Sequence, residues 1–248
     1  MVSVYIASMN RAAAEGRSET KNLDPSTEPD LKAKSPSDRL QWAIESFPEK
    51  VALTTSFGAQ SAAFLHWASQ ISPALPVIFI DTGYHFPETL AFASELTARL
   101  GLNLKTYRPL LTPTQIESQH GLLWQEGPSG LEKFHEIIRV EPLQRALAEL
   151  NPSVWVAGLR GSSSPYRKSL DILVRQKARY KLLPILEWTD REVGLYLKQH
   201  SLPYHPLWAQ GYVSIGDRVT TRRLDEVSDP AELRHFGWKR ECGIHEKV

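Results

Sequence analysis

Short apolar runs alternate with helix-forming segments from about residue 36 to residue 200. The run at residues 77–80 is apolar at every position, which is typical of a strand covered on both faces. Between such runs, apolar residues recur three or four positions apart, as they do on one face of a helix. This alternation predicts an α/β fold with a doubly wound, mostly parallel sheet.

The boundaries of these elements follow from local signals. Ser37 is the expected cap of the first helix, Gly101 ends the third, and Thr189 with Glu192 forms a capping box before the last. Helices are expected at 38–47, 59–70, 88–100, 131–150 and 190–200, and strands at 51–55, 77–80, 102–107, 154–158 and 182–186.

Three segments differ in composition. Residues 1–34 are polar and interrupted by proline, which predicts a flexible N-terminal tail. Residues 35–200 carry the alternating pattern and form the α/β domain. Residues 201–248 lose the periodicity and are rich in Pro, Trp, Tyr and Arg, so we expect this C-terminal segment to be mobile or ordered only against a ligand or partner.

Composition excludes several classes of protein. The 248 residues carry a formal net charge of only +1, so a general nucleic-acid binder is not expected and any anion site must be local. No apolar run approaches the roughly 18 residues that span a bilayer, and residues 2–7 are too short for the core of a signal peptide. We therefore expect a cytoplasmic protein that does not enter a membrane.

Cys242 is the only cysteine. This count excludes an intrachain disulfide, a four-cysteine iron–sulfur site and a cysteine-built zinc site. Lys239, Arg240 and His245 place positive charge near the thiol, which favours the reactive thiolate. Cys242 is thus either a nucleophile that reacts with a partner outside the chain or an incidental thiol.

Two strand ends carry residues suited to a nucleotide, because ligands of parallel sheets bind beyond the carboxyl ends of strands. After the first strand, hydroxyls and a glycine precede a helix, an arrangement that suits a phosphate or sulfate but also an ordinary cap and turn. The candidates there are Ser56, Gly58, Gln60 and Ser61. After the second strand, Asp81 is placed to accept from a ribose or base, or else to cap the next helix.

A local basic cluster follows the strand at 154–158. Residues 160–181 contain seven Lys or Arg and one acid, Asp171. Such a cluster matches a ligand with several negative charges, because arginine forks hold phosphate oxygens. The alternative is a solvated charged face.

Four motifs, in order from about residue 36 to the end, resemble those of the adenylyl-sulfate and phosphoadenylyl-sulfate reductases. They are Ser56-Phe57-Gly58-Ala59-Gln60-Ser61, Asp81-Thr82-Gly83-Tyr84-His85-Phe86-Pro87-Glu88-Thr89, Arg139-Val140-Glu141-Pro142-Leu143 and Lys239-Arg240-Glu241-Cys242-Gly243-Ile244-His245. The resemblance implies an adenine-nucleotide α-hydrolase-like, Rossmann-like fold. It also implies that Cys242 attacks the activated sulfate to form S-sulfocysteine, from which thioredoxin releases sulfite.

The resemblance also bears on cofactor and substrate. Members with an iron–sulfur cluster carry cysteines where this chain has Phe134, His135, Asp217 and Thr220. The chain is therefore similar to the cluster-free branch, which implies no bound cofactor and 3′-phosphoadenylyl sulfate as substrate in sulfate assimilation. A cluster-free reductase that accepts adenylyl sulfate, or both substrates, is the alternative.

Residues carried over from the family complete the expected site. The anionic groups would meet cationic side chains, namely Arg139, Arg160, Arg234, Lys239 and Arg240. Many members continue Arg-Glu-Gln-Ser after the arginine at 160, whereas this chain has Gly161-Ser162-Ser163-Ser164, which leaves selectivity for the 3′-phosphate open. Relatives are often homodimers.

Two other classes of protein fit the sequence less well. An ATP pyrophosphatase of the same fold would need a Ser-Gly-Gly-x-Asp-Ser loop, which the motif at 56–61 does not match. A nucleotide-binding module without catalysis would not need Cys242.

Overall fold

The computed structural model describes residues 30–176, 179–238, 243 and 244. By contacts between α-carbons the chain divides into Met1–Asp30 and Leu31–Val248, and the second unit carries the fold. The predicted N-terminal tail lies outside the described residues except for residues 30–34, of which Leu31 is buried. No helix in the described part of the chain is long and apolar enough to cross a bilayer.

In the described part of the chain, six strands form one sheet in the order β3-β2-β1-β4-β6-β5. All neighbours are parallel except β5 and β6. The strands are β1 (Val51–Thr55), β2 (Pro76–Ile80), β3 (Asn103–Tyr107), β4 (Val154–Ala157), β5 (Leu173–Gln176) and β6 (Arg179–Leu182). The predicted α/β class with a mostly parallel sheet is confirmed.

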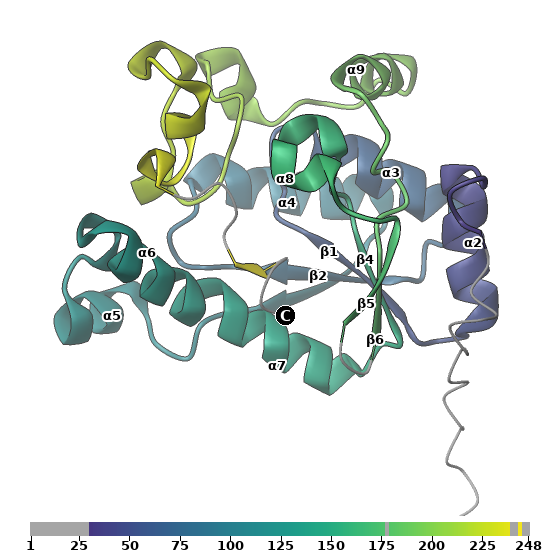
Figure 1. The fold of residues 1–248 in the computed structure, drawn as a ribbon, viewed down its shortest axis with the longest axis horizontal. Coiled ribbons are helices and arrows are strands. Elements are labelled where there is room, and N and C mark those ends of the chain that lie inside the picture. Colours follow the sequence, from purple (N-terminus) through teal and green to yellow (C-terminus); the bar gives the residue numbers. More distant parts are fainter. Residues whose placement is uncertain (1–29, 177–178, 239–242, 245–248) are drawn as a thin grey trace, which may run out of the picture. The chain divides into compact units, whose positions relative to one another are not determined.

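Helices cover both faces of the sheet (Figure 1). Helices α3 (Ser61–Ile71) and α4 (Pro87–Leu100) lie on one face, and α7 (Glu141–Leu150) lies on the other. The chain winds outward from β1 through β2 to β3, then returns through α7 to β4 on the other side of β1. The winding direction therefore reverses between β1 and β4, where sheets of this kind hold their ligands.

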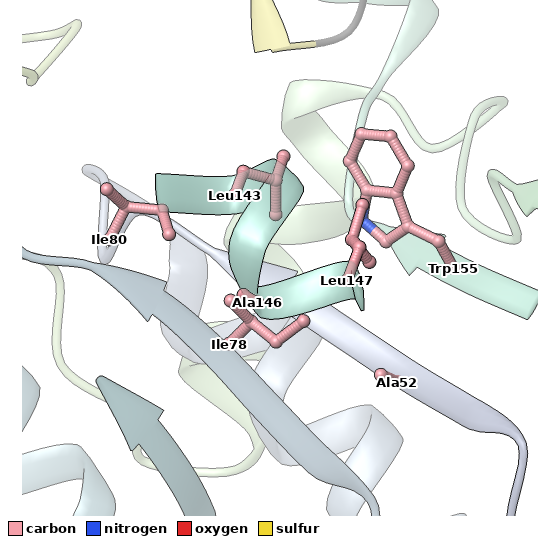
Figure 2. Close-up of a cluster of buried hydrophobic side chains, with 7 residues drawn as sticks. All are labelled: Ala52, Ile78, Ile80, Leu143, Ala146, Leu147 and Trp155. Atoms are coloured by element: carbon pink, nitrogen blue, oxygen red, sulfur yellow. The ribbon is translucent and has the colours of Figure 1, made fainter. Parts of the chain in front are cut away.

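Alternate strand residues face the two helical layers. Leu143, Ala146 and Leu147 of α7 pack against Ala52, Ile78, Ile80 and Trp155 (Figure 2). Trp155 is fully buried, and its Nε1 donates a 2.8 Å hydrogen bond to Oγ1 of Thr54, which satisfies its one polar atom. The neighbouring strand positions, such as Leu53 and Phe79, are also buried, as expected for a sheet covered on both sides.

The long helix expected at 131–150 is interrupted. The structure has α6 (Gly127–His135), a π-helical turn (Glu136–Val140) and then α7. Pro142 lies in the first turn of α7 and has no N–H with which to continue an α-helical ladder. Arg139 lies within this π-helical turn, so its side chain leaves the helix in a different direction from the one that a continuous α-helix would give it.

Local boundaries differ from expectation in two places. Ser35, not Ser37, caps α2 (Pro36–Ser46), because Oγ of Ser35 accepts from the Asp38 N–H at 3.2 Å. The strand expected at 182–186 is β6, which ends at Leu182, and its hairpin partner β5 was not expected. Both strands of the hairpin carry basic residues, so their sequence was interpreted as part of the basic cluster and not as strands. The predicted capping box at Thr189 is confirmed and opens α9 (Asp190–Gln199).

The remaining elements are short. They are α5 (Pro113–His120), α8 (Pro165–Lys168) and the 3₁₀ turns Leu123–Gln125, Gly161–Ser163, Pro206–Gln210, Arg218–Thr220, Leu224–Glu226, Pro230–Leu233 and His235–Gly237. We expected a C-terminal segment at residues 201–248, and the structure describes it continuously from residue 201 to Trp238. Five of these turns lie in that part. Buried His205 and Asp217 bond this part to the rest of the domain. Its order therefore comes from contacts within the chain.

Candidate active site

A cavity of about 720 Å³ lies where the winding of the sheet reverses. Its walls come from the carboxyl ends of β1 and β4, the start of α3, the π-helical turn and the C-terminal segment. Of the residues predicted from sequence, Ser56, Gly58, Gln60, Ser61, Arg139, Arg160 and Arg234 line it. The fold thus brings most of the expected site residues together from four separate segments of the chain.

The loop after β1 contains a buried aromatic ring. Phe57 has a left-handed backbone conformation (φ 47°), is fully buried, and stands edge-on to Phe79 with ring centroids 5.0 Å apart. Oγ1 of Thr55 accepts from the Phe57 N–H at 3.1 Å. A methyl group at Gly58 would make an ordinary van der Waals contact, 3.6 Å from Oγ of Ser56. The glycine therefore leaves room at the cavity wall rather than relieving a clash.

The start of α3 faces this room. Among the described residues no side chain caps the helix at Gln60; the Ser61 N–H donates to the Gly58 carbonyl at 3.1 Å and the Ala63 N–H to the Gln60 carbonyl at 3.2 Å. Oγ of Ser61 is shielded from solvent and has no hydrogen-bond partner among the described residues. An uncapped helix start beside an unpartnered hydroxyl suits an anionic oxygen.

The loop after β4 brings a second set of groups. Gly158 passes so close to Phe64 that a methyl group there would lie 2.7 Å from the ring. Arg160 donates to Oε1 of Gln60 at 2.6 Å and pairs with Asp190 at 2.7 Å. Further along, Ser162, Ser163 and Arg167 also line the cavity.

Arg139 reaches the cavity from the opposite helical layer. It forms a buried ion pair with Asp217, with Nη2 at 2.6 Å and Nε at 3.1 Å from Oδ2. Thr82 donates to the other oxygen, Oδ1, at 2.7 Å. Burial alone would raise the pKa of Asp217, but Arg139 and the Thr82 hydrogen bond hold it well below its usual range. The pair is therefore charged at neutral pH.

Arg234 lines the wall formed by the C-terminal segment. Its Nη1 donates to the carbonyl of Ile215 at 3.0 Å, and its guanidinium occupies the place that a methyl group on Gly216 would take. His235, the next residue, also lines the cavity. Burial lowers the pKa of His235 well below its usual value, and the charge of Arg234 adds to the effect. The positive charge on this wall comes from arginine, not histidine.

Asp81 is placed elsewhere. It lies at the end of β2, is not part of the cavity lining, and forms an ion pair with Arg108 at 2.8 Å. Its Oδ1 also accepts from the Gly83 N–H at 3.2 Å. The carboxylate is thus engaged in shaping its own turn, and its expected contact with the nucleotide stays a prediction.

The predicted basic cluster is not one surface. Arg160 and Arg167 line the cavity, whereas Arg175 lies in β5. Lys181 is buried in β6 with Nζ 4.8 Å from the centre of the Trp155 ring. A run of basic residues that enters a hairpin places alternate side chains on opposite faces, so its members separate.

Aromatic residues of the cavity were not predicted as site residues. Trp188, Tyr204 and Trp208 line it, and the rings of Tyr204 and Trp208 stack 5.0 Å apart. Stacked rings suit a planar base. For Tyr204 and Trp208 the only signal in the sequence is the aromatic content of the aperiodic segment 201–248, and Trp188 lies outside that segment.

The C-terminal motif is described only in part. Lys239, Arg240 and Cys242 lie outside the described residues. Ile244 lines the cavity and packs against the cluster of Figure 2, which includes Leu143 of α7. The chain two residues beyond Cys242 therefore lies at the cavity. Among the described residues, no group of three or more His, Cys, Asp or Glu side chains is placed to hold a metal ion.

Comparison with known proteins identifies the family. A family described as the phosphoadenosine phosphosulfate reductase domain matches residues 50–223. The chain belongs to the phosphoadenosine phosphosulfate reductase family. Membership confirms the predicted family and its class of enzyme.

Individual members agree. A phosphoadenosine 5′-phosphosulfate reductase of Xanthomonas oryzae is 53% identical over 211 residues, which cover 85% of this chain and 88% of that protein. The crystal structure of phosphoadenylyl-sulfate reductase from Candida auris, a phosphate complex, matches with a TM-score of 0.67 and 29% identity over 78% of this chain and 93% of that one. Candida glabrata FMN adenylyltransferase (TM-score 0.57, 18% identity, 84% of this chain and 71% of that one) shares the fold alone.

Proposed function

We propose that this protein reduces 3′-phosphoadenylyl sulfate to sulfite and adenosine 3′,5′-bisphosphate in sulfate assimilation, with thioredoxin as reductant. The observation that carries the proposal is the placement of Ile244, two residues after the only cysteine, at the cavity that holds the start of α3 and four arginines. A thiol reaching this cavity meets a site built for an anionic nucleotide.

The reaction has two displacements. The Cys242 thiolate attacks the sulfate sulfur, the bond from sulfur to the bridging phosphate oxygen breaks, and adenosine 3′,5′-bisphosphate leaves with the electron pair. A thioredoxin thiolate then attacks Sγ of the S-sulfocysteine, and sulfite leaves with the pair of that S–S bond. The second thioredoxin thiol resolves the mixed disulfide, so one dithiol is oxidised for each sulfate reduced.

The cavity residues have distinct tasks in this scheme. The start of α3, with Ser56 and Ser61, holds anionic oxygens through N–H and O–H donors. Arg139 and Arg234 line the cavity with Ile244 and stabilise the negative charge that develops on the leaving phosphate. The stacked Tyr204 and Trp208 offer a surface for the adenine.

Preference for the 3′-phosphate is part of the proposal. This phosphate adds about −1.5 to −2 charge relative to adenylyl sulfate. Arg160 and Arg167, with the hydroxyls of Ser162 and Ser163, form a second group of donors beside Arg139 and Arg234. Two groups of cationic and hydroxyl side chains along one cavity favour the more highly charged substrate. A reductase that uses adenylyl sulfate is the alternative.

The deciding experiment measures sulfite released by purified protein with reduced thioredoxin, from each of the two substrates. We expect a strong preference for 3′-phosphoadenylyl sulfate. Without reductant, intact-mass analysis should find one SO₃ unit on the wild-type chain and none on Cys242→Ser. Sulfite formation by Cys242→Ser would refute the covalent mechanism, and nucleotide binding without turnover by the wild type would indicate a binding module.

Two accompanying features are proposed with the function. The protein needs no bound cofactor, and it assembles as a homodimer. Sedimentation equilibrium of the full chain measures the second, with a single mass near 28.0 kDa contradicting it.

A further inference from the structure

Asp217 is fully buried, and its carboxylate accepts hydrogen bonds from two side chains. One oxygen accepts from Nε and Nη2 of Arg139, and the other accepts from Thr82. Two bonds from one guanidinium to one oxygen fix both the position and the plane of the arginine. Arg139 is itself only 5% exposed at its side chain, yet it lines the cavity.

The carboxylate is not the only contact that holds its own segment. The backbone of Asp217 forms an antiparallel bridge with His85, and the Arg218 N–H donates to the Tyr84 carbonyl at 2.8 Å. These bonds tie the C-terminal segment to the loop before α4 whatever side chain stands at 217. A buried ion pair is a costly way to join two elements, because apolar residues of similar volume do so without desolvating charge.

We propose that Asp217 is a positioning residue, which holds the Arg139 guanidinium in the cavity wall in the orientation that meets an anionic group of the substrate. Thr82 supports it by fixing the second carboxylate oxygen. Because Asp217 belongs to the C-terminal segment and Arg139 to the π-helical turn, the contact also makes the placement of the cation depend on that segment. The proposal rests on the proposed function in that Arg139 is taken to contact the substrate.

The test is a double-mutant cycle on Asp217 and Arg139. Asp217→Asn keeps the shape of the side chain and removes its charge. We expect it to lower kcat/KM for 3′-phosphoadenylyl sulfate by about tenfold or more, as for loss of a charged hydrogen bond. In an Arg139→Gln background the same change should cost less than about twofold, because there is no guanidinium left to orient.

A purely structural role of Asp217 predicts different results. If Asp217 only stabilised the fold, Asp217→Asn would lower the melting temperature, and the protein that remains folded would keep its kcat/KM in each background. Equal losses, or a folded Asp217→Asn with wild-type kinetics, would overturn the proposal. Isothermal titration with adenosine 3′,5′-bisphosphate gives a second readout of the same cycle, independent of turnover.

Two further variants keep the test decisive. If Asp217→Asn fails to fold, Thr82→Val replaces it. This change removes the hydrogen bond to one carboxylate oxygen and the bond that Oγ1 of Thr82 accepts from the Tyr84 N–H, but it leaves the ion pair. We expect a loss of about twofold to fivefold that again vanishes with Arg139→Gln, and its persistence there would overturn the proposal. Glu187→Gln is the control, because Glu187 pairs with buried Arg39 and neither residue lines the cavity, so the change should leave kinetics unchanged.

Wild-type protein is assayed first. Absence of sulfite from the wild type would count against the proposed function. Sulfite from the wild type, with Asp217→Asn unchanged, would count against the positioning role alone.

Discussion

Arg160 and Gln60 join the two loops that flank the cavity, through a 2.6 Å hydrogen bond from Nη2 to Oε1. Gln60 precedes α3, and Arg160 follows β4. The same guanidinium pairs with Asp190 at the start of α9. One arginine therefore connects three segments at the point where the sheet reverses.

Arg160→Ala should lower kcat/KM for 3′-phosphoadenylyl sulfate by about 10- to 100-fold, because a hydrogen bond to a charged group contributes about 1.5–3 kcal/mol. Arg160→Lys should recover only part of this loss, since it keeps the charge but not the fork that reaches Gln60 and Asp190 together. Sulfite release measures both. The matched control is Arg145→Ala, which removes an arginine that pairs with Glu141 and does not line the cavity. Equal losses at Arg160 and Arg145 would contradict the assignment.

Ser61→Ala separates binding from stability. Oγ of Ser61 has no partner among the described residues, so its removal should leave the melting temperature unchanged. If the hydroxyl donates a hydrogen bond to a substrate oxygen, KM should rise about 2- to 12-fold, because one such hydrogen bond contributes about 0.5–1.5 kcal/mol. Ser35→Ala should do the reverse, because it removes the cap of α2 at a cost of about 1 kcal/mol in stability. A melting-point drop in Ser61→Ala without a change in KM would show that the hydroxyl is structural.

The sequence predicted the parallel strands well because their signal is strong. Residues 77–80 are apolar throughout, as a strand covered on both faces requires. Strand β5, and with it the hairpin that it forms with β6, is not predicted because these strands carry charged residues such as Arg175 and Lys181, which are more easily interpreted as a basic surface. Burial of Lys181 against Trp155 depends on a tertiary contact that no local pattern reveals.

The site was predictable where it follows directly from a strand end. Ser56 and Ser61 reach the cavity because the loop after β1 lies at the reversal point of the sheet. Asp81 also follows a strand, but the parallel pairing of β2 with β3 brings Arg108 beside it, a contact set by register rather than by sequence spacing. The side chains of Trp188 and Tyr204 were not predicted, since residues without periodicity give no direction for a ring.

Gly216→Ala should impair binding more than stability. A methyl group at Gly216 would overlap the end of the Arg234 side chain, which is flexible enough to swing away. The guanidinium then leaves the cavity wall and its bond to the Ile215 carbonyl. We expect KM to rise about tenfold, as for a lost charged hydrogen bond, with a stability change below about 1 kcal/mol.

Gly158→Ala is the contrasting variant. Its methyl group would lie 2.7 Å from the ring of Phe64, which is buried and has no room to move. Overpacking of this kind costs about 1–3 kcal/mol, or roughly 2–4 °C in melting temperature for each kcal/mol. Differential scanning calorimetry with titration of adenosine 3′,5′-bisphosphate measures both quantities for the two variants. A Gly216→Ala protein that melts early but binds normally would contradict the role given to Arg234.

His205 should make the protein sensitive to acid. The Leu207 N–H donates to Nδ1 at 3.1 Å, so the neutral ring carries its proton on Nε2, 2.9 Å from Oγ1 of Thr89. Burial lowers the pKa of His205 to about 4, against the opposing effect of Glu88. The unfolded chain, with a histidine pKa of about 6.5, takes up the proton first, so stability is full above about pH 6.5 and falls as the pH drops toward 4. The free energy of unfolding should fall by about 2 kcal/mol at pH 5 because of this residue.

His205→Gln should be less stable than the wild type at pH 7, but its free energy of unfolding should fall correspondingly less between pH 7 and pH 5, as measured by urea unfolding. An equal loss in the wild type and the variant would mean that His205 is not the group that titrates.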